Sequence, residues 1–355
     1  MKINEHSKML LSAIILVVTS TYIVLEVTAA FQTVYVKSGD YIIPEGQVDD
    51  NLYIRLQSPN SSIIMKSGSK LMNSKISCDA SNHNEHAVII EGSDAVLENV
   101  QFNVNNCGGD GIHAEGVSNI HIWQGTISKP KGFGINFNNV NNSEIFGVFI
   151  NAAKSGGILL GSSNQNQIVT TLIFQVTNTV ALKIDGNSHK NQVVRSRARH
   201  NNAVMQSDAE DNLFYHSVCE KRVGYVGCVT DYGDEPKNWG IPTDFQPVWR
   251  TACYPKSFQR GKCDYLTPQL AIAASSDNDR VVVDTNGQTG WGNVTISTQG
   301  LLLLGNELTM QGAYGYINYL DSLNVTAPNV HVQNFVVRSN PIVQNDTILT
   351  AITVK

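Results

Sequence analysis

Three side chains in two phrases of this chain have the types and spacing for acid–base chemistry. Lys183 and Asp185 alternate in ALKIDG, and His113 lies in GDGIHAEG between two further carboxylates. Removal of the proton beside a uronate carboxylate needs a general base, together with a cation or basic side chain that neutralises the carboxylate. These residues are therefore the candidate catalytic set of a polysaccharide lyase or epimerase. The simpler alternative is an ordinary exposed Lys–Asp pair and an exposed histidine.

A basic segment, VVRSRARH, has the pattern for binding an acidic polymer. Its arginines alternate, so a strand would place Arg195, Arg197 and Arg199 on one face. Guanidinium groups bind carboxylates and sulfates through paired hydrogen bonds. The alternative is that the acidic segment 208–211 neutralises them. With flanking and outward neighbours included, the candidate substrate-binding residues are Arg195, Arg197, Arg199, Lys190, Asn136 and Glu115.

Other kinds of site are not expected. His83 and His86 in NHNEH lack a third defined ligand, so the sequence predicts no metal site. The chain has no phosphate-binding loop, no dinucleotide fingerprint and no serine or cysteine nucleophile motif. No cofactor is therefore expected, although calcium would suit a lyase. The formal net charge of −5 gives no indication of nucleic-acid binding.

A repeat determines the elements that would position these side chains. Subtracting the numbers of successive apolar residues gives steps of 23, 23, 24 and 22 for Ile112, Ile135, Ile158, Leu182 and Val204. Short β-rich segments at such a period predict stacked coils. Alternation then turns His113, Lys183 and Met205 outward, and a coil spacing of about 4.8 Å puts His113 roughly 14 Å from Lys183. That spacing suits contact with successive units of an extended polymer.

A second series follows the first in phase. It consists of Asn119, Asn142, Asn166, Asn191 and Asn212. Asparagine tolerates tight turns, and stacked copies hydrogen-bond along a coil stack. The series therefore predicts a structural ladder of amides rather than a ligand site.

The repeats and the later order TPQLAIAA, VVV, NVTI and LLLLG resemble the pectin-lyase-like superfamily. The resemblance implies an all-β fold, a right-handed parallel β-helix (a solenoid) with a short second β-helical block. It leaves the activity open, because the superfamily includes pectate and alginate lyases, polygalacturonases, epimerases, tailspikes and adhesins. The polygalacturonase motif set and the pectate-lyase signatures Arg-x-Pro-x-x-Arg and Trp-x-Asp-His are absent from this chain.

Four segments are expected along the chain. Residues 1–30 form a signal peptide or signal anchor, and residues 31–218 form an N-terminal cap and the coils. Residues 219–262, rich in cysteine and proline, form a linker or excursion, and residues 263–355 form the second block. That block has only about three coils, the least that usually suffices for stability. It is a truncated or split paralogue, or it docks on the first stack.

Several features favour export. A basic start, an apolar run and the small residues of 27–29 are typical of a secretory signal, and an uncleaved anchor is the alternative. Six cysteines allow fifteen pairings; near-neighbour pairs are favoured, and free buried thiols are the alternative. The favoured pairs are Cys219 with Cys228, Cys253 with Cys263, and Cys78 with Cys107. The glycosylation sequons are Asn60, Asn141, Asn293, Asn324 and Asn345.

Together these patterns predict a secreted or cell-surface glycoprotein that binds carbohydrate. An acidic polysaccharide or cell-surface glycan is the expected partner. A membrane would be a partner only through an uncleaved N-terminal segment, and nucleic acid is not expected. A wall, adhesin or surface component is the first hypothesis, and a lyase or epimerase acting on uronate polymers is the alternative.

Overall fold

The computed structural model describes most of the chain after the expected signal segment. The described ranges are 31–80, 83–177, 180–230, 247–253, 263–284, 290–305, 318–344 and 346–354. The signal segment 1–30, the sequon at Asn345 and most of the expected linker lie outside the described residues.

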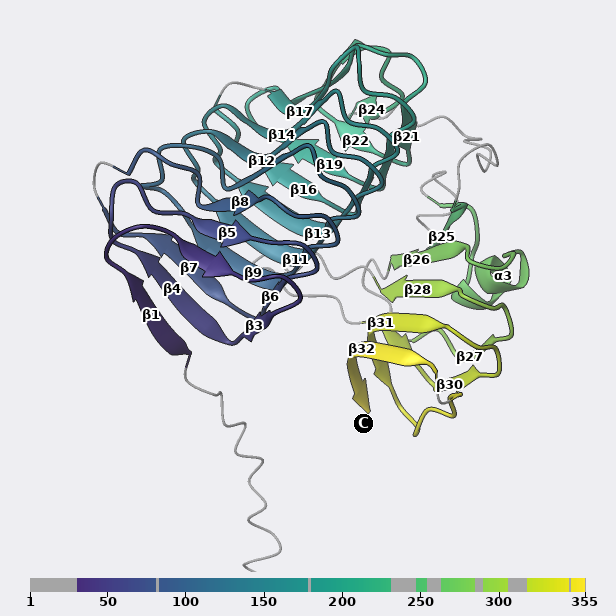
Figure 1. The fold of residues 1–355 in the computed structure, drawn as a ribbon. Helices are drawn as coiled ribbons and strands as arrows, with labels where there is room; N and C mark the ends of the chain where they lie inside the picture. Colours follow the sequence, from purple (N-terminus) through teal and green to yellow (C-terminus); the bar gives the residue numbers. More distant parts are fainter. Residues whose placement is uncertain are drawn as a thin grey trace, which may run out of the picture.

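Parallel strands from successive coils form a sheet of nine strands, which we call the nine-stranded sheet (Figure 1). All pairings along it are parallel. The predicted all-β parallel β-helix is thus confirmed. In spatial order the strands are β2 (Tyr41–Ile43), β5 (Ile63–Met65), β8 (Val88–Ile90), β10 (Ile112–Glu115), β12 (Phe133–Asn138), β14 (Gly156–Gly161), β17 (Val180–Ile184), β20 (Val204–Ser207) and β23 (Lys221–Gly224).

The other wall of the β-helix is a sheet of fifteen strands, which we call the fifteen-stranded sheet. Its main path is β1 (Gln32–Val36), β4 (Leu52–Leu56), β7 (Lys75–Cys78), β9 (Val96–Asn103), β11 (His121–Ser128), β13 (Glu144–Asn151), β16 (Leu172–Phe174), β19 (Arg197–Arg199), β22 (Val218–Cys219) and β24 (Val229–Thr230). Its side branches are β3 (Val48–Asp50), β6 (Lys70–Met72), β15 (Gln167–Val169), β18 (Gln192–Val194) and β21 (Leu213–Tyr215). Segment 31–80, expected as a cap, contributes its strands to these same two sheets.

The repeat alignment is correct for four coils and wrong at the fifth. Ile112, Ile135, Ile158 and Leu182 occupy one register position and are fully buried. A β-bulge between Val180 and Leu182 then shifts the pairing, so Leu182 lies beside Met205 rather than beside Val204. Met205 was expected to point outward, but it is fully buried in the core. An inserted residue of this kind reverses which neighbours face inward.

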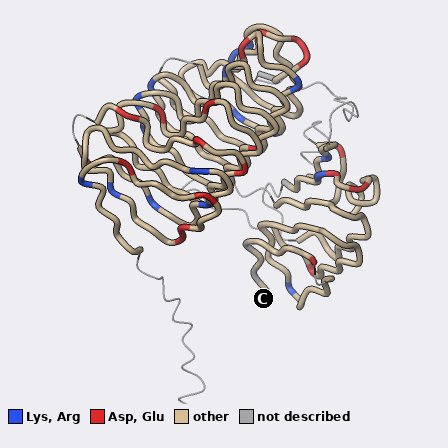
Figure 2. The backbone as a smooth tube through the Cα atoms, in the orientation of Figure 1, with Lys and Arg blue, Asp and Glu red and all other residues tan. Residues whose placement is uncertain are grey.

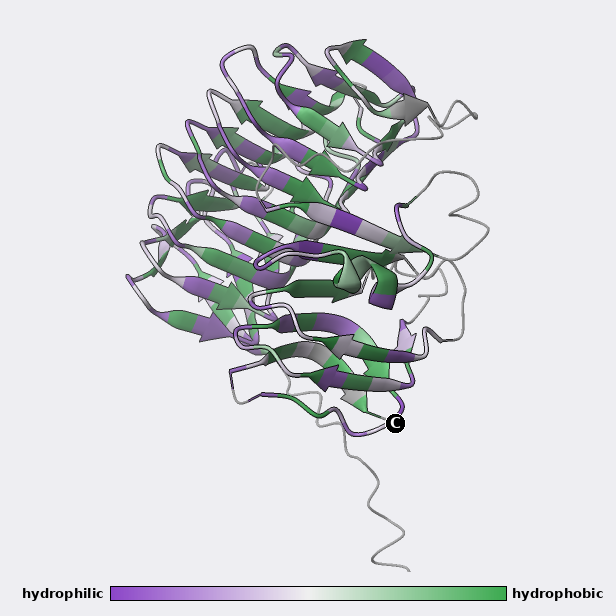
Figure 3. Ribbon diagram, turned by 90° about the vertical axis from the view of Figure 1, so that its right-hand side faces the viewer, coloured by the Kyte–Doolittle hydropathy of each residue, from purple (hydrophilic) through white to green (hydrophobic). Residues whose placement is uncertain are grey.

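A column of glycines fixes the thickness of the core. A Cβ on Gly134 would lie 2.5 Å from Cγ2 of Ile150, and a Cβ on Gly157 would lie 2.4 Å from Cγ2 of Ile173. Such contacts are far too short for packed carbon atoms, so only glycine lets the two walls approach this closely. The phrases GFGI and SGGI therefore reflect packing against the opposite wall. Figure 3 shows the hydrophobic residues along the strands of both parts.

The predicted amide ladder is confirmed for three of its five members. Nδ2 of Asn166 donates to Oδ1 of Asn191 at 3.1 Å, and Nδ2 of Asn191 donates to Oδ1 of Asn212 at 3.0 Å. All three side chains are buried. Asn119 and Asn142 instead stand one register position earlier, exposed and with left-handed φ values of 56° and 54°. The step from Asn142 to Asn166 is 24 residues, close to the length of one coil, so the spacing in the sequence does not reveal this shift.

The second block is a smaller parallel β structure with its own core. Its only described helix, α3 (Pro268–Ala273), begins at the N-cap Thr267, whose side chain accepts from the N–H of Leu270. The strands are β25 (Trp249–Cys253), β26 (Arg280–Asp284), β27 (Asn293–Ile296), β28 (Leu302–Gly305), β29 (Tyr319–Leu320), β30 (Ser322–Val325), β31 (His331–Val337) and β32 (Ile348–Val354).

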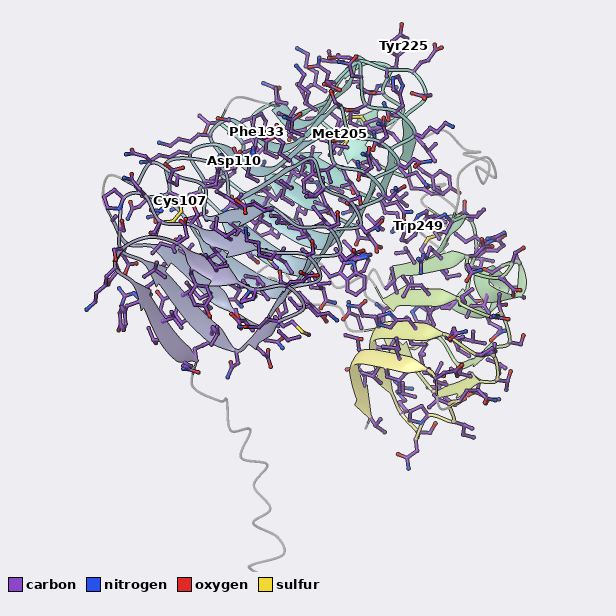
Figure 4. All side chains as sticks on the ribbon, in the orientation of Figure 1. Cys107, Asp110, Phe133, Met205, Tyr225 and Trp249 are labelled. Atoms are coloured by element: carbon purple, nitrogen blue, oxygen red, sulfur yellow. A yellow bond between two sulfur atoms is a disulfide. The ribbon has the colours of Figure 1, made fainter. Side chains whose placement is uncertain are left out.

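The second block docks on the outer side of the fifteen-stranded sheet. Trp249 from β25, labelled in Figure 4, is buried in a cluster that also contains Phe146 and Tyr215 of the β-helix. Nε1 of Trp249 donates to Gln167 at 3.2 Å. The cluster is completed by Val169, Val194, Val282, Leu302 and Leu304. Of the alternatives that the sequence leaves open, the structure shows docking.

A carboxylate whose side chain is only 10% exposed joins the two parts. Tyr215 donates its hydroxyl hydrogen to Asp264 of the second block, and Nε2 of His216 lies 3.2 Å from the same oxygen. Thr251 donates its N–H and its hydroxyl to the other oxygen, at 2.8 and 2.7 Å. Burial alone would raise the pKa of Asp264, but the contacts with His216, Tyr215 and Thr251 outweigh burial and lower that pKa.

We expect docking to weaken in acid. A carboxyl with a lowered folded pKa contributes stability above its unfolded pKa of about 3.9, and this contribution is lost as the pH falls through the folded pKa. Tryptophan fluorescence followed from pH 7 to pH 2 should therefore report a transition in the acid range. In Asp264→Asn the docked state should be weaker at pH 7, and this transition should shrink. An unchanged acid transition in the variant would contradict the assignment to Asp264.

Candidate functional site

The outward face of the nine-stranded sheet carries one straight file of side chains. Register pairing aligns each member with the next in the neighbouring coil. We call these residues the outer file: Ile89, His113, Asn136, Leu159, Lys183 and Gln206. All six are half-buried, and neighbouring members are about 4.8 Å apart along the stack. The file therefore combines apolar contact surface with hydrogen-bonding and basic groups.

Near one end of the outer file, His113 belongs to a histidine cluster with His86 and Asp110. Nδ1 of each imidazole lies 3.2 Å from Oδ2 of Asp110. The two rings stack, with centroids 4.3 Å apart and planes 15° apart. Asn136 donates to the same oxygen at 2.9 Å, and the N–H of Phe133 donates to Oδ1 at 2.7 Å. Figure 4 labels Asp110 and Phe133 on neighbouring coils.

The carboxylate at the centre of the histidine cluster is ionised at neutral pH. Burial alone would raise the pKa of Asp110. Contacts with His113, His86 and Asn136 and the N–H of Phe133 outweigh burial, so the pKa of Asp110 is held well below its ordinary value. The side chain of Asp110 is 7% exposed, against 30% for His86 and 21% for His113. A shielded negative charge therefore lies beneath two accessible imidazoles.

Glycines make room for the histidine cluster. A Cβ on Gly109 would lie 2.6 Å from Nδ1 of His86, and a Cβ on Gly132 would lie 2.2 Å from Oδ1 of Asp110. His86 and Asp110 occupy the same turn in successive coils, because each stands two residues before its strand. The amide N–H of Asp110 donates to Nδ1 of His86 at 2.9 Å. Repeat and turn geometry together assemble the cluster.

His86 is the functional candidate that motif reasoning missed. The sequence pairs it with His83, but His83 is buried and its Nε2 contacts the carbonyl oxygen of Ser61 at 2.7 Å. The signal that finds His86 is its spacing of 24 residues from Asp110, which equals one coil. Of the two carboxylates that flank His113 in GDGIHAEG, Asp110 contacts its imidazole.

The candidate catalytic set is not assembled as one site. Asp185 binds its own turn and the neighbouring coil: it accepts from the hydroxyl of Ser188 at 2.6 Å and from the N–H of Ser162, one coil earlier, at 3.1 Å. Lys183 lies three strands from His113 in the nine-stranded sheet. Lys183 and His113 therefore occupy separate positions along the outer file, and Asp185 has a structural role.

The expected row of three arginines is wrong at Arg195. This residue has a left-handed φ of 48° at a bend between β18 and β19, so alternation does not continue through it. Its side chain is buried and its charge acts on Tyr215, which places it near the docked second block. Arg197 and Arg199 share the outward face of β19, as expected, and both are half-buried and engaged in contacts.

The remaining binding candidates occupy separate positions. Lys190 is exposed in a turn with φ 56°, and Oε1 of Glu115 accepts from Asn138 at 3.1 Å. Asn136 belongs to the outer file and holds Asp110. Figure 2 shows basic and acidic residues interspersed over the described chain rather than gathered on one basic face.

Three disulfides confirm the favoured pairing. They join Cys78 to Cys107, Cys219 to Cys228, and Cys253 to Cys263. Such bonds fit an oxidising compartment.

The sequons that the structure describes occupy different surroundings. Asn60 and Asn293 are exposed, whereas Asn141 and Asn324 are half-buried. Oδ1 of Asn141 also accepts from the N–H of Asn164 at 2.9 Å. Glycosylation at these sites stays a prediction.

No described helix combines the length and the apolar character needed to span a membrane.

Comparison with known proteins places the chain in no family. No family model matches the sequence, and no curated protein matches it. Among solved structures, the PL6 family alginate lyase AlyGC is similar at a TM-score of 0.20 and 8% identity, over 91% of this chain and 72% of the lyase chain. An arginine mutant of that lyase gives a TM-score of 0.18 and 9% identity, over 90% and 73%. Likeness at this level carries no argument about activity, so any function must be argued from the geometry of the outer file and the histidine cluster.

Proposed function

We propose that this protein is a secreted, pectin-lyase-like β-helix that binds an acidic polysaccharide along the outer file. The observation that carries the proposal is the unbroken register from His113 through Asn136 and Leu159 to Lys183. Within the described residues, no hydrogen bond or ion pair engages the ammonium group of Lys183. A lysine that is half-buried and has no partner among the described residues favours an anionic ligand.

The chemistry of the outer file suits a chain of sugar units. Asn136 and Gln206 offer amide donors and acceptors to hydroxyl groups. Leu159 and Ile89 offer apolar surface to the carbon–hydrogen faces of sugar rings. Lys183 supplies the charge for a carboxylate or sulfate. A polymer lying along the stack would meet these groups in turn, at the coil spacing of about 4.8 Å.

A second function, lyase or epimerase chemistry, is supported by one specific contact. Asp110 accepts from Nδ1 of His113 at 3.2 Å, which would orient the ring and leave Nε2 of His113 as the base. Lys183 would then bind the polymer away from the reacting unit. Binding without turnover remains the first proposal, because Asp185 is committed to its turn and Lys183 is too distant to share a proton with His113.

Binding should be tested with polygalacturonate, alginate and sulfated glycans on the signal-less protein. We expect Lys183→Ala to weaken binding about tenfold or more, because a charged hydrogen bond contributes about 1.5–3 kcal/mol. Lys154→Ala removes an exposed lysine outside the outer file and should leave binding unchanged. Binding of the wild-type protein should also weaken as salt is added.

The same samples test the second function. Formation of unsaturated uronates, followed by absorbance, should be absent if the protein only binds. Turnover that disappears in His113→Ala would establish the lyase. Equal affinity of wild-type and Lys183→Ala proteins for every polymer would contradict binding along the outer file.

A further inference from the structure

We propose that the histidine cluster is a site for a divalent transition-metal ion, with Zn²⁺ as the expected occupant. His86 and His113 would supply imidazole nitrogens, and Asp110 would supply a carboxylate oxygen. Two imidazoles and one carboxylate are a common protein ligand set for zinc and for other first-row metals that accept nitrogen. The proposal goes beyond glycan binding, which needs no metal.

The spacing of the three ligand atoms fits one ion. A tetrahedral ion with bonds of about 2.0–2.2 Å separates neighbouring ligand atoms by about 3.4 Å. Nδ1 of His86 and Nδ1 of His113 each lie 3.2 Å from Oδ2 of Asp110. All three atoms lie within 4.8 Å of one another. One ion can therefore reach all three without movement of the backbone.

The polar atoms of the cluster also suit a cation. Nδ1 of His86 accepts the amide N–H of Asp110 at 2.9 Å and lies 3.2 Å from Oδ2 of the same residue. Nitrogen and carboxylate oxygen atoms are therefore gathered at one place, and a metal ion would use them as ligands.

The surrounding residues provide support and access. The N–H of Phe133 and the side-chain amide of Asn136 orient the carboxylate of Asp110, as groups around metal ligands commonly do. The imidazoles are partly exposed, so an ion can enter from solvent. Coordination requires the stacked rings to tilt until their lone pairs converge, and His86 must turn from the amide of Asp110. This reorganisation lowers the affinity, and we expect a dissociation constant in the micromolar range.

Zinc binding should be measured by equilibrium dialysis without polysaccharide and without reductant. We expect one ion per chain in the wild-type protein, and at least tenfold weaker binding in His86→Ala and in His113→Ala. His189→Ala is the matched control, because His189 contacts Asp211 at 2.9 Å on an exposed turn outside the cluster. Circular dichroism would verify that each variant is folded. Calcium should not compete, because it prefers oxygen ligands.

A spectroscopic measurement gives the ligands directly. Cu²⁺ bound at the site should show coupling to two imidazole nitrogens in electron paramagnetic resonance, reduced to one in either histidine variant. Absence of zinc binding in the wild-type protein at 100-fold the expected constant (about 0.1 mM for a 1 µM site) would overturn the proposal. Zinc retained by both variants would also overturn it, as would binding that needs reduction of the Cys78–Cys107 disulfide beside His83. Because no glycan is present, these outcomes are independent of polysaccharide binding.

Discussion

Trp249→Ala should separate the unfolding of the second block from that of the β-helix. The indole is 1% exposed and lies in the cluster between the two parts, so its removal leaves a cavity at the docking surface. Truncation of a buried tryptophan costs about 3–5 kcal/mol of unfolding free energy. In urea, far-UV circular dichroism should show an early loss of the second block, followed by the β-helix.

The control for this prediction is Tyr225→Ala. Tyr225 is 60% exposed, so its truncation should change the unfolding free energy by no more than about 0.5 kcal/mol. A single transition in Trp249→Ala, with the wild-type midpoint, would show that the docking surface contributes little to stability.

Asn191→Leu should destabilise the β-helix itself. Oδ1 of Asn191 accepts from the N–H of Asn166 at 2.9 Å, and its Nδ2 donates to the carbonyl of Ser163 at 2.8 Å. Leucine satisfies neither group, and each buried polar group without a partner costs about 1–3 kcal/mol. With the broken contact to Asn212 included, a loss of about 3–5 kcal/mol is expected. Urea denaturation of the purified variant measures it.

The matched control is Asn119→Gly. Asn119 comes from the same series in the sequence, but it is exposed with a left-handed φ, which glycine adopts at no steric cost. Its unfolding free energy should stay within about 0.5 kcal/mol of wild type. Equal losses in both variants would mean that the ladder stabilises the fold no more than a surface turn does.

The fold could be predicted from the sequence because each coil repeats the same physical solution. Ile112, Ile135 and Ile158 recur at the length of one coil, and glycines precede them where the opposite wall leaves no room for a Cβ. Two disulfides could be predicted because they join near neighbours in the sequence, and Cys78 with Cys107 was the pair that remained. Features that repeat in this way can be predicted from the sequence without knowledge of long-range contacts.

The candidate site was harder to predict from the sequence, because its geometry depends on departures from the repeat. The bend at Arg195 reverses the alternation that placed three arginines on one face. The β-bulge between Val180 and Leu182 also reverses the alternation, so that Met205 faces the core. His86 was missed because its partner stands in the next coil rather than in its own phrase. Each error arises where one residue more or fewer changes which side chains share a face.

The contacts between the two parts also determine when each part acquires structure during folding. Ladder contacts within the β-helix join residues 21–25 apart, whereas Trp249 reaches Gln167 over 82 residues and Gln124 reaches Asn334 over 210. Long separations make contact formation slow. We therefore expect the coils to form first and docking to come last. Until then, the apolar strip around Phe146 is open to solvent, and newly made chains are most prone to associate with one another during that interval.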